Sequence, residues 1–174
     1  GDKILVSGAL AEHGIAILSV REGLAFDAPI VSDSAPLHSL VGDLLAVLGE
    51  RVHVLRDPTR GGVASALNEI ASAAQVAIRL DEAALPVAPA VRGACEILGL
   101  DPLYVANEGK LVAVCPAADA EGLLAAMRAH RHGRDAAIIG EVTDDPHHFA
   151  QMETSCGGRR VVDWPPGEQV RRVC

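Results

Sequence analysis

The sequence predicts an α+β domain in which helices pack on a mixed sheet. Strand-like and helix-like segments alternate along the early part of the chain, whereas its end is mostly strand-like. The length of 174 residues suits one domain with a sizeable core. Because 49% of the residues are hydrophobic but only 2% are aromatic, alanine, valine, leucine and isoleucine must build that core.

In the early part of the chain, apolar periodicity separates strands from helices. Leu40, Leu44 and Leu48 recur at the spacing of one helical face. Ser34 precedes this helix as a start signal, and Gly49 ends it. The expected elements are a strand over 3–8, a helix entered at 13–18, a helix over 36–49, a strand over 52–55 and a helix over 62–75.

The later part of the chain is richer in strands. Short apolar runs over 103–106 and 111–115 flank the turn 107–110, as two strands around a turn would. Regular structure is expected to end at 164–167, where proline and glycine follow a tryptophan. The other expected elements are a strand over 76–80, helices near 90–98 and 120–127, and strands over 136–142, 149–153 and 159–163.

Charge and apolar pattern exclude several classes of function. The net charge of −8 argues against a general binder of nucleic acid or of an anionic membrane, since both need a basic face. No apolar run approaches the roughly 20 residues that span a bilayer, and no secretory signal opens the sequence. Cys95 and Cys115 lie in apolar runs typical of buried thiols. These features favour a cytoplasmic protein.

The loop over 56–63 is the sharpest chemical motif, because two glycines stand between an expected strand and an expected helix. Gly61 and Gly62 allow backbone amides to approach an anion closely, and a helix N-terminus favours negative charge. Arg60 adds donors for phosphate oxygens, and Asp57 is a candidate Mg²⁺ ligand. The alternative is an ordinary turn in which Asp57 or Thr59 caps the helix.

The turn Asn107-Glu108-Gly109-Lys110 is the second motif. A glutamate beside a glycine at the edge of a strand can project into a cleft and act as a base. The alternative is a surface ion pair between Glu108 and Lys110, which contributes little. His13 is expected in a turn or cap. The remaining loop histidines lack metal-site spacing and are expected to be solvated: His130, His132, His147 and His148.

The sequence ends on Cys174, after a polar segment over 165–174 that we expect to be mobile. A thiol there can be charged with a group and carried to several sites. Extended, this segment reaches at most about 33–36 Å, enough to move a thiol between a cleft and a partner. The alternative is an incidental surface cysteine.

Taken together, these pieces resemble the HypE family of nickel–iron hydrogenase maturation proteins, within the PurM/AIR-synthetase-like ATPase superfamily. The resemblance is carried, in order, by GDKILVSG, EHGIAILSVREGL, SDSAPL, RDPTRGGVASALNEIA, DPLYVANEGKL, TSCGGRRVV and the final cysteine. It implies a PurM C-terminal-domain-like fold over 1–164 and a mobile tail over 165–174. It also implies that an N-terminal domain with the dimer core and most of the ATP site is absent from this sequence.

The resemblance implies a dehydration carried on a thiol. A HypF-like carbamoyltransferase would load a carbamoyl group onto Cys174, and ATP would drive its conversion to a thiocyanate. The cyanide would pass to iron in a HypC–HypD complex. Glu108 matches the position of the proton-removing base. Four residues would face the nucleotide phosphates: Arg60, Gly61, Gly62 and Asn107, with Asp57 toward Mg²⁺.

Two departures and two rival functions accompany the resemblance. Arg171-Arg172-Val173 stands where the family usually has Pro-Arg-Ile, and Glu12 stands where it often has Asp. Neither departure removes a reacting atom, so they bear on the fit of partners. The rivals are a selenophosphate-synthetase-like ATPase of the same superfamily and a docking or thiol-carrier module without catalysis.

Overall fold

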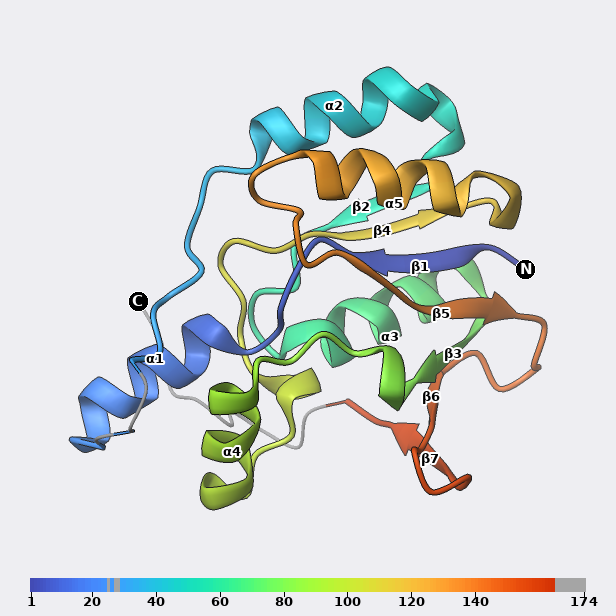
Figure 1. Ribbon diagram of the computed structural model, residues 1–174. Coiled ribbons are helices and arrows are strands. Elements are labelled where there is room, and N and C mark those ends of the chain that lie inside the picture. Colours follow the sequence, from blue (N-terminus) through green and yellow to red (C-terminus); the bar gives the residue numbers. More distant parts are fainter. Residues whose placement is uncertain (25, 27–28, 165–174) are drawn as a thin grey trace.

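The computed structural model describes residues 1–24, 26 and 29–164, and these form a mixed sheet with helices on both faces (Figure 1). Within the described residues the sheet has the strand order β2-β4-β1-β5-β3-β6-β7. Strands β3 and β6 pair in parallel, and the other neighbouring strands pair antiparallel. The strands are β1 (Lys3–Val6), β2 (Val54–Arg56), β3 (Ala77–Asp81), β4 (Val112–Cys115), β5 (Ala137–Thr143), β6 (Ala150–Glu153) and β7 (Arg159–Val162). The expected α+β fold with a mixed sheet is confirmed.

The helices form two layers and one end group (Figure 1). Helices α2 and α5 contact each other on one face of the sheet, and α3 covers the other face. Helices α1 and α4 pack together at one end. The helices are α1 (Glu12–Glu22), α2 (His38–Leu48), α3 (Gly62–Ala74), α4 (Pro89–Leu98) and α5 (Ala120–Ala129). Short 3₁₀ turns cover Gly49–Arg51, Glu82–Ala84, Pro102–Tyr104 and Ala117–Asp119.

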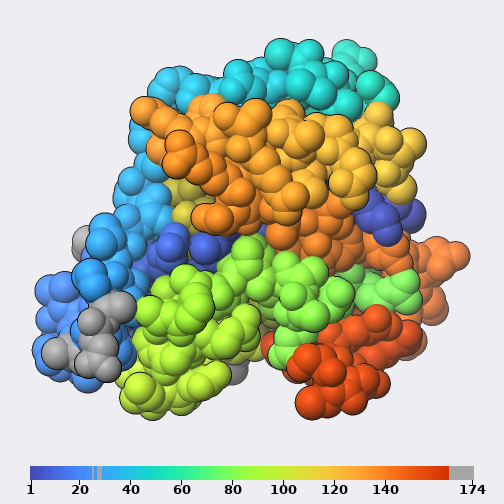
Figure 2. All heavy atoms as spheres, viewed as in Figure 1, coloured from blue at the N-terminus to red at the C-terminus, as the bar shows by residue number. Residues whose placement is uncertain are grey.

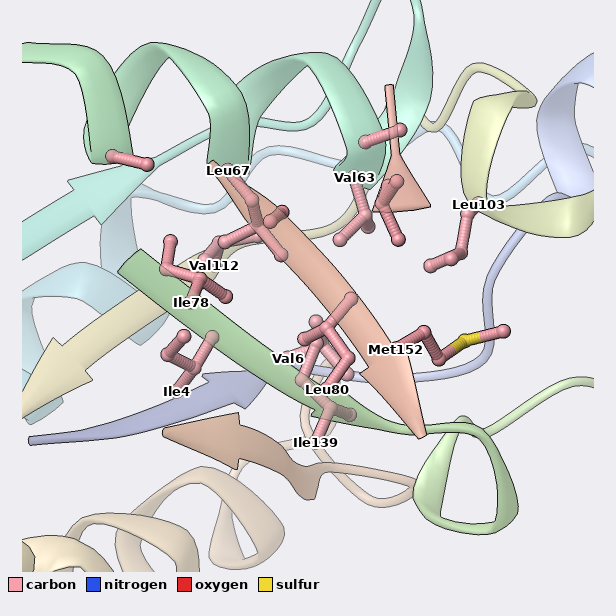
Figure 3. Packing of buried hydrophobic residues seen from close by; sticks show 14 of the residues in the cluster. Ile4, Val6, Val63, Leu67, Ile78, Leu80, Leu103, Val112, Ile139 and Met152 are labelled. Carbon is pink, nitrogen blue, oxygen red and sulfur yellow. The ribbon is translucent and has the colours of Figure 1, made fainter. Parts of the chain in front are cut away.

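The alternation of side chains along β1 explains the two faces. Ile4 and Val6 point into the cluster under α3, where they meet Val63 and Leu67 (Figure 3). Leu5 points to the opposite face, in the cluster with α2 and α5. All of these side chains are fully buried. The aliphatic core predicted from composition is confirmed, and no described helix is long and apolar enough to cross a membrane.

The strand predicted over 103–106 is wrong. The chain there forms the 3₁₀ turn Pro102–Tyr104, because the Asp101 carboxylate accepts a hydrogen bond from the Leu103 N–H at 2.9 Å. The segment then binds to helix α1, where the Gly14 N–H donates to the Ala106 carbonyl at 3.1 Å. Its backbone polar groups are thus used by a turn and a helix terminus, which leaves them unavailable for a sheet.

Candidate functional site

The turn 107–110 connects the 3₁₀ turn to β4 and is anchored first by Asn107. The Asn107 side chain is fully buried, and its oxygen accepts a hydrogen bond from the Ala11 N–H at 2.9 Å. Its amide nitrogen donates to the carbonyls of Pro58 and Val105, each at 3.1 Å. One side chain therefore holds together the start of α1, the Gly-Gly loop and the turn. Because its amide groups are engaged inside the protein, the structure gives Asn107 an internal bonding role.

Glu108 is exposed, whereas the residues on both sides of it are buried or ion-paired. Gly109 lies so close to the segment 33–35 that a Cβ there would stand 1.7 Å from the Asp33 carbonyl oxygen. Beyond the turn, the Ser7 N–H donates to the Leu111 carbonyl at 2.9 Å, and the Leu111 N–H donates to the Ser7 hydroxyl at 2.9 Å. The turn thus presents one free carboxylate from a backbone that is fixed on both sides.

Lys110 does not pair with Glu108, contrary to the alternative reading of the turn. Its ammonium donates to the Glu12 carboxylate at 3.1 Å and lies 3.1 Å from Oδ2 of Asp33. The Asp33 side chain is 1% exposed and that of Lys110 is 11% exposed. Oδ1 of Asp33 accepts a hydrogen bond from the Glu108 N–H at 3.3 Å. Three charged side chains therefore meet beneath the turn.

The Gly-Gly loop lies beside this turn, because the Pro58 carbonyl accepts hydrogen bonds from both the backbone and the side chain of Asn107. Gly61 and Gly62 have φ values of 73° and 61°, in the left-handed region that favours glycine. A Cβ on Gly62 would stand 2.4 Å from the Leu103 carbonyl oxygen. The loop is therefore fixed where helix α3 begins. No side-chain cap from Asp57 or Thr59 closes that helix.

The side chains of Asp57 and Arg60 point away from this packing. Both residues are exposed, and neither makes a hydrogen bond or ion pair with another described residue. Within the loop the neighbouring Arg56 is the paired cation, 2.6 Å from the Glu69 carboxylate. An exposed arginine and carboxylate beside a helix N-terminus are available to an incoming anion and its counter-ion.

A hollow of about 170 Å³ opens beside the charged cluster. In Figure 2, dark-blue atoms of the early chain lie recessed between the orange segment after α5 and the light-blue segment before α2. Desolvation, followed by the charges of Arg131, His130 and Lys110, lowers the pKa of His132 in its wall. The lining residues are Ser7, Gly8, Ala9, Glu12, Asp33, Gly109, Lys110, Arg131, His132, Arg134 and Asp135.

Within the part of the chain described here, no three His, Cys, Asp or Glu side chains lie close enough together to hold a metal ion. His13 lies in the first turn of α1, with Nδ1 2.8 Å from the Ser32 hydroxyl. Cys95 and Cys115 are buried as expected. Cys174, the predicted carrier thiol, lies outside the described residues, as does the whole segment 165–174.

The structure brings together two of the predicted groups and adds a third that the sequence did not indicate. The Gly-Gly loop and the turn with Glu108 meet through Asn107. Asp33 was missed because it lies in a segment without regular structure, 75 positions before its bonding partner Glu108. The one signal for it was the run Ser32-Asp33-Ser34, whose polar side chains suit a turn.

Known proteins resemble this chain in both sequence and structure. Residues 1–153 match the family model of the AIR synthase related protein, C-terminal domain. Carbamoyl dehydratase HypE of Cupriavidus necator is 64% identical over 174 residues, which are 100% of this chain and 49% of that protein. Carbamoyl dehydratase HypE of Azotobacter vinelandii is 60% identical over 100% of this chain and 51% of its own length. The chain thus spans about half the length of the curated relatives it matches.

Solved structures give the same assignment. The crystal structure of hydrogenase maturation protein HypE aligns with a TM-score of 0.95 and 47% identity, over 100% of this chain and 56% of that one. A HypE structure in complex with ATP has a TM-score of 0.92, 46% identity and coverage of 97% and 52%. A HypE–HypF complex has a TM-score of 0.91, 48% identity and coverage of 95% and 53%. The expected PurM-like fold is confirmed, and the chain belongs to the family of the AIR synthase related protein, C-terminal domain, with HypE proteins as its relatives.

Proposed function

We propose that this chain is the C-terminal half of an ATP-dependent carbamoyl dehydratase that serves nickel–iron hydrogenase maturation in the cytoplasm. Similarity over the whole chain to proteins named carbamoyl dehydratase HypE supports the proposal. Within the chain, one observation carries it. Glu108 is an exposed carboxylate on a turn that Asn107 and Gly109 hold rigidly beside the Gly-Gly loop. A base must be free to reach its substrate and yet be fixed in position.

In the proposed reaction, Cys174 carries the substrate as an S-carbamoyl group. The carboxamide oxygen attacks the terminal phosphorus of ATP, and ADP leaves. Two N–H protons depart in all, one as the oxygen is phosphorylated and one as phosphate leaves. Glu108 accepts a proton in the second step, while the carbon–oxygen bond breaks and the carbon–nitrogen triple bond forms. The products are a thiocyanate on the sulfur of Cys174 and free phosphate.

The Gly-Gly loop is proposed to meet the phosphates of the nucleotide. Gly61 and Gly62 bring the start of α3 close, where backbone N–H groups favour negative charge. The free guanidinium of Arg60 supplies further donors. Asn107 acts in this scheme by holding the loop in place, since its own amide is engaged.

For Mg²⁺, the proposal names a single candidate ligand, Asp57. The described residues hold no cluster of metal ligands, and Asp57 alone does not make a site. Mg²⁺ binds carboxylate together with substrate phosphates, so Asp57 is the residue that would meet an ion arriving with the nucleotide.

Two solved relatives support one of the proposed partners and the co-substrate. A solved HypE relative is in complex with HypF, which supports a HypF-like carbamoyltransferase as the donor to Cys174. Another solved relative is in complex with ATP, which supports ATP as the co-substrate. A HypC–HypD complex as acceptor, and a homodimer formed by the other half of the protein, complete the proposal. In it, residues 1–164 form the domain and 165–174 a mobile tail.

The test is the intact mass of the longer protein after incubation with its carbamoyltransferase, carbamoyl phosphate and ATP. We expect a gain of one carbamoyl group at Cys174, followed by the loss of one water. Cys174→Ala removes both changes, whereas Cys156→Ala, which alters the exposed cysteine of the described residues, keeps them. Glu108→Gln is loaded but not dehydrated.

Three other results would contradict parts of the proposal. No adduct at Cys174 would contradict the carrier role and favour the rival ATPase of the same superfamily. An adduct that never loses water in the parent protein would leave only a thiol carrier. Dehydration at the parental rate in Glu108→Gln would remove this residue as the base.

A further inference from the structure

Asp33 lies in the segment 29–37, which has no regular secondary structure, yet its side chain is almost completely buried. A buried carboxylate is costly unless it is paired and hydrogen-bonded. Here Lys110 supplies the charge, at 3.1 Å from Oδ2, and the Glu108 N–H supplies a hydrogen bond to Oδ1. The carboxylate therefore spans Gly109 and holds the residues on both sides of it.

The segment around Asp33 is itself fixed against the turn. Gly109 packs directly on the backbone of 33–35, so closely that no side chain would fit at this position. Ser32, the preceding residue, is 2.8 Å from Nδ1 of His13 through its hydroxyl. Lys110 is held by Glu12, in the same first turn of α1. Helix α1, the segment 32–35 and the turn are thereby joined beneath Glu108.

We propose that Asp33 is a positioning residue for Glu108, and that its carboxylate, held by Lys110, fixes the turn from which Glu108 reaches the substrate. The inference rests on the proposed function of Glu108. Asp33 does not contact the Glu108 side chain in any hydrogen bond or ion pair of the described residues, and it acts through the Glu108 backbone. Loss of its carboxylate removes the hydrogen bond to the Glu108 N–H, whereas the contacts of Asn107 and the packing of Gly109 remain.

The test compares Asp33→Ala with Asp119→Ala in the longer protein. Asp119 is the control, because it is a mostly buried carboxylate, 14% exposed, that pairs with a cation, Arg51, in the 3₁₀ turn Ala117–Asp119, away from Glu108 and the Gly-Gly loop. We expect Asp33→Ala to slow dehydration of the loaded thiol about 10- to 100-fold in a single turnover, the loss that a small misplacement produces. The rate of carbamoyl loading should stay within about twofold of the parent, and Asp119→Ala should leave both rates unchanged.

Three further measurements separate positioning from general damage. Asp33→Asn keeps an oxygen for the Glu108 N–H but loses the charge opposite Lys110, so it should restore part of the rate. Hydrogen exchange should rise at the amides of 108–110 in Asp33→Ala and not in Asp119→Ala. In a Glu108→Gln background, which does not dehydrate, Asp33→Ala should still raise hydrogen exchange at 108–110, because Asp33 acts on the backbone of the turn.

The outcomes distinguish this inference from the function on which it rests. An inactive Glu108→Gln protein beside a fully active Asp33→Ala protein would overturn the role of Asp33 alone. So would unchanged exchange at 108–110, or an equal loss of loading and dehydration in Asp33→Ala. A fully active Glu108→Gln protein would instead remove the base, and the proposed function with it.

Discussion

Burial divides the thiols of this chain by reactivity. Burial, assisted by the nearby charge of Asp101, raises the pKa of Cys95 to about 11, and burial also raises the pKa of Cys115. Cys156 is exposed, in the turn after β6. Because the thiolate is the reactive form, the two buried thiols should be protected from electrophiles at neutral pH. A reactive cysteine elsewhere in the protein then competes only with Cys156.

We therefore predict that iodoacetamide at pH 8 alkylates Cys156 in the folded protein roughly 100-fold faster than Cys95, and faster than Cys115. Peptide mapping by mass spectrometry gives the rate at each site. In denaturant the differences should disappear, which serves as the control. Labelling of Cys95 at the rate of Cys156 in the folded protein would contradict the packing between α1 and α4.

A carboxylate on β5 makes stability depend on acid pH. Glu141 bonds to Lys3 at 2.6 Å and also pairs with Arg79, and these hydrogen bonds lower its pKa. A lowered pKa in the folded state stabilises the protein above the pKa of unfolded glutamate, about 4.3. That contribution is lost as the pH falls through the lower, folded value.

Glu141→Gln should therefore lower the free energy of unfolding at pH 7 by at most about 1 kcal/mol, since the three side chains are partly exposed and screened by water. The difference from the parent should shrink as the pH falls below about 4. Urea unfolding at pH 7, 5 and 3 measures it. Glu50→Gln, at an exposed residue without a described partner, should show no such change. A difference that is equal at pH 7 and pH 3 would contradict the assignment to ion pairs.

For single residues, the sequence could indicate Glu108 as a candidate base but not the residues that hold its turn in place. A glutamate between asparagine and glycine is visible in a linear pattern, and so are two consecutive glycines. The partners of Lys110 are not, because Glu12 lies 98 positions away along the chain and Asp33 in a segment without periodicity. The adjacent Glu108 was the plausible local partner, and the fold selected two distant carboxylates instead.

Among the elements, the start of α3 is the one whose geometry depends most on a single residue. Gly62 combines a φ of 61° with a Cβ position 2.4 Å from the Leu103 carbonyl oxygen. Gly99, after α4, has a φ of 65° but open space around its Cβ position. A substitution at Gly99 therefore tests backbone strain alone, whereas one at Gly62 tests backbone strain and steric contact together.

We predict that Gly99→Ala costs about 1 kcal/mol, from the left-handed backbone alone. Gly62→Ala should cost more than about 2 kcal/mol, because α3 or the 3₁₀ turn at Pro102–Tyr104 must also move. Denaturant unfolding of both variants beside the parent gives the two free energies. Equal losses would show that the contact between α3 and the 3₁₀ turn yields easily.

Elements were predicted well where periodicity was strong and poorly where a turn competed. Helices α2, α3 and α5 lie close to their expected bounds, because their buried faces repeat at the helical period. Strands β4 to β7 also lie close to theirs, because each coincides with a short apolar run or an alternating pattern. Residues 103–106 are equally apolar, but Asp101 and Pro102 favour a 3₁₀ turn. Apolar content alone did not distinguish these two outcomes.

For the molecule as a whole, the two hydrophobic clusters share one sheet. Strand β1 sends Ile4 and Val6 to one face and Leu5 to the other, so neither cluster can form without it. Domains of this size usually unfold in one cooperative step. We expect this chain, even if it is half of a longer protein, to hold its fold by itself.

The last prediction separates folding from catalysis. The 174-residue chain should unfold in one calorimetric transition, yet hydrolyse ATP no faster than a Cys174→Ala version of itself. The reason lies in the site: the described part offers an exposed Arg60, an exposed Asp57 and a helix terminus, but no group of metal ligands. Joining the N-terminal half should bring turnover that depends on both Cys174 and Glu108. Turnover by the isolated chain would mean that the site is already complete within it.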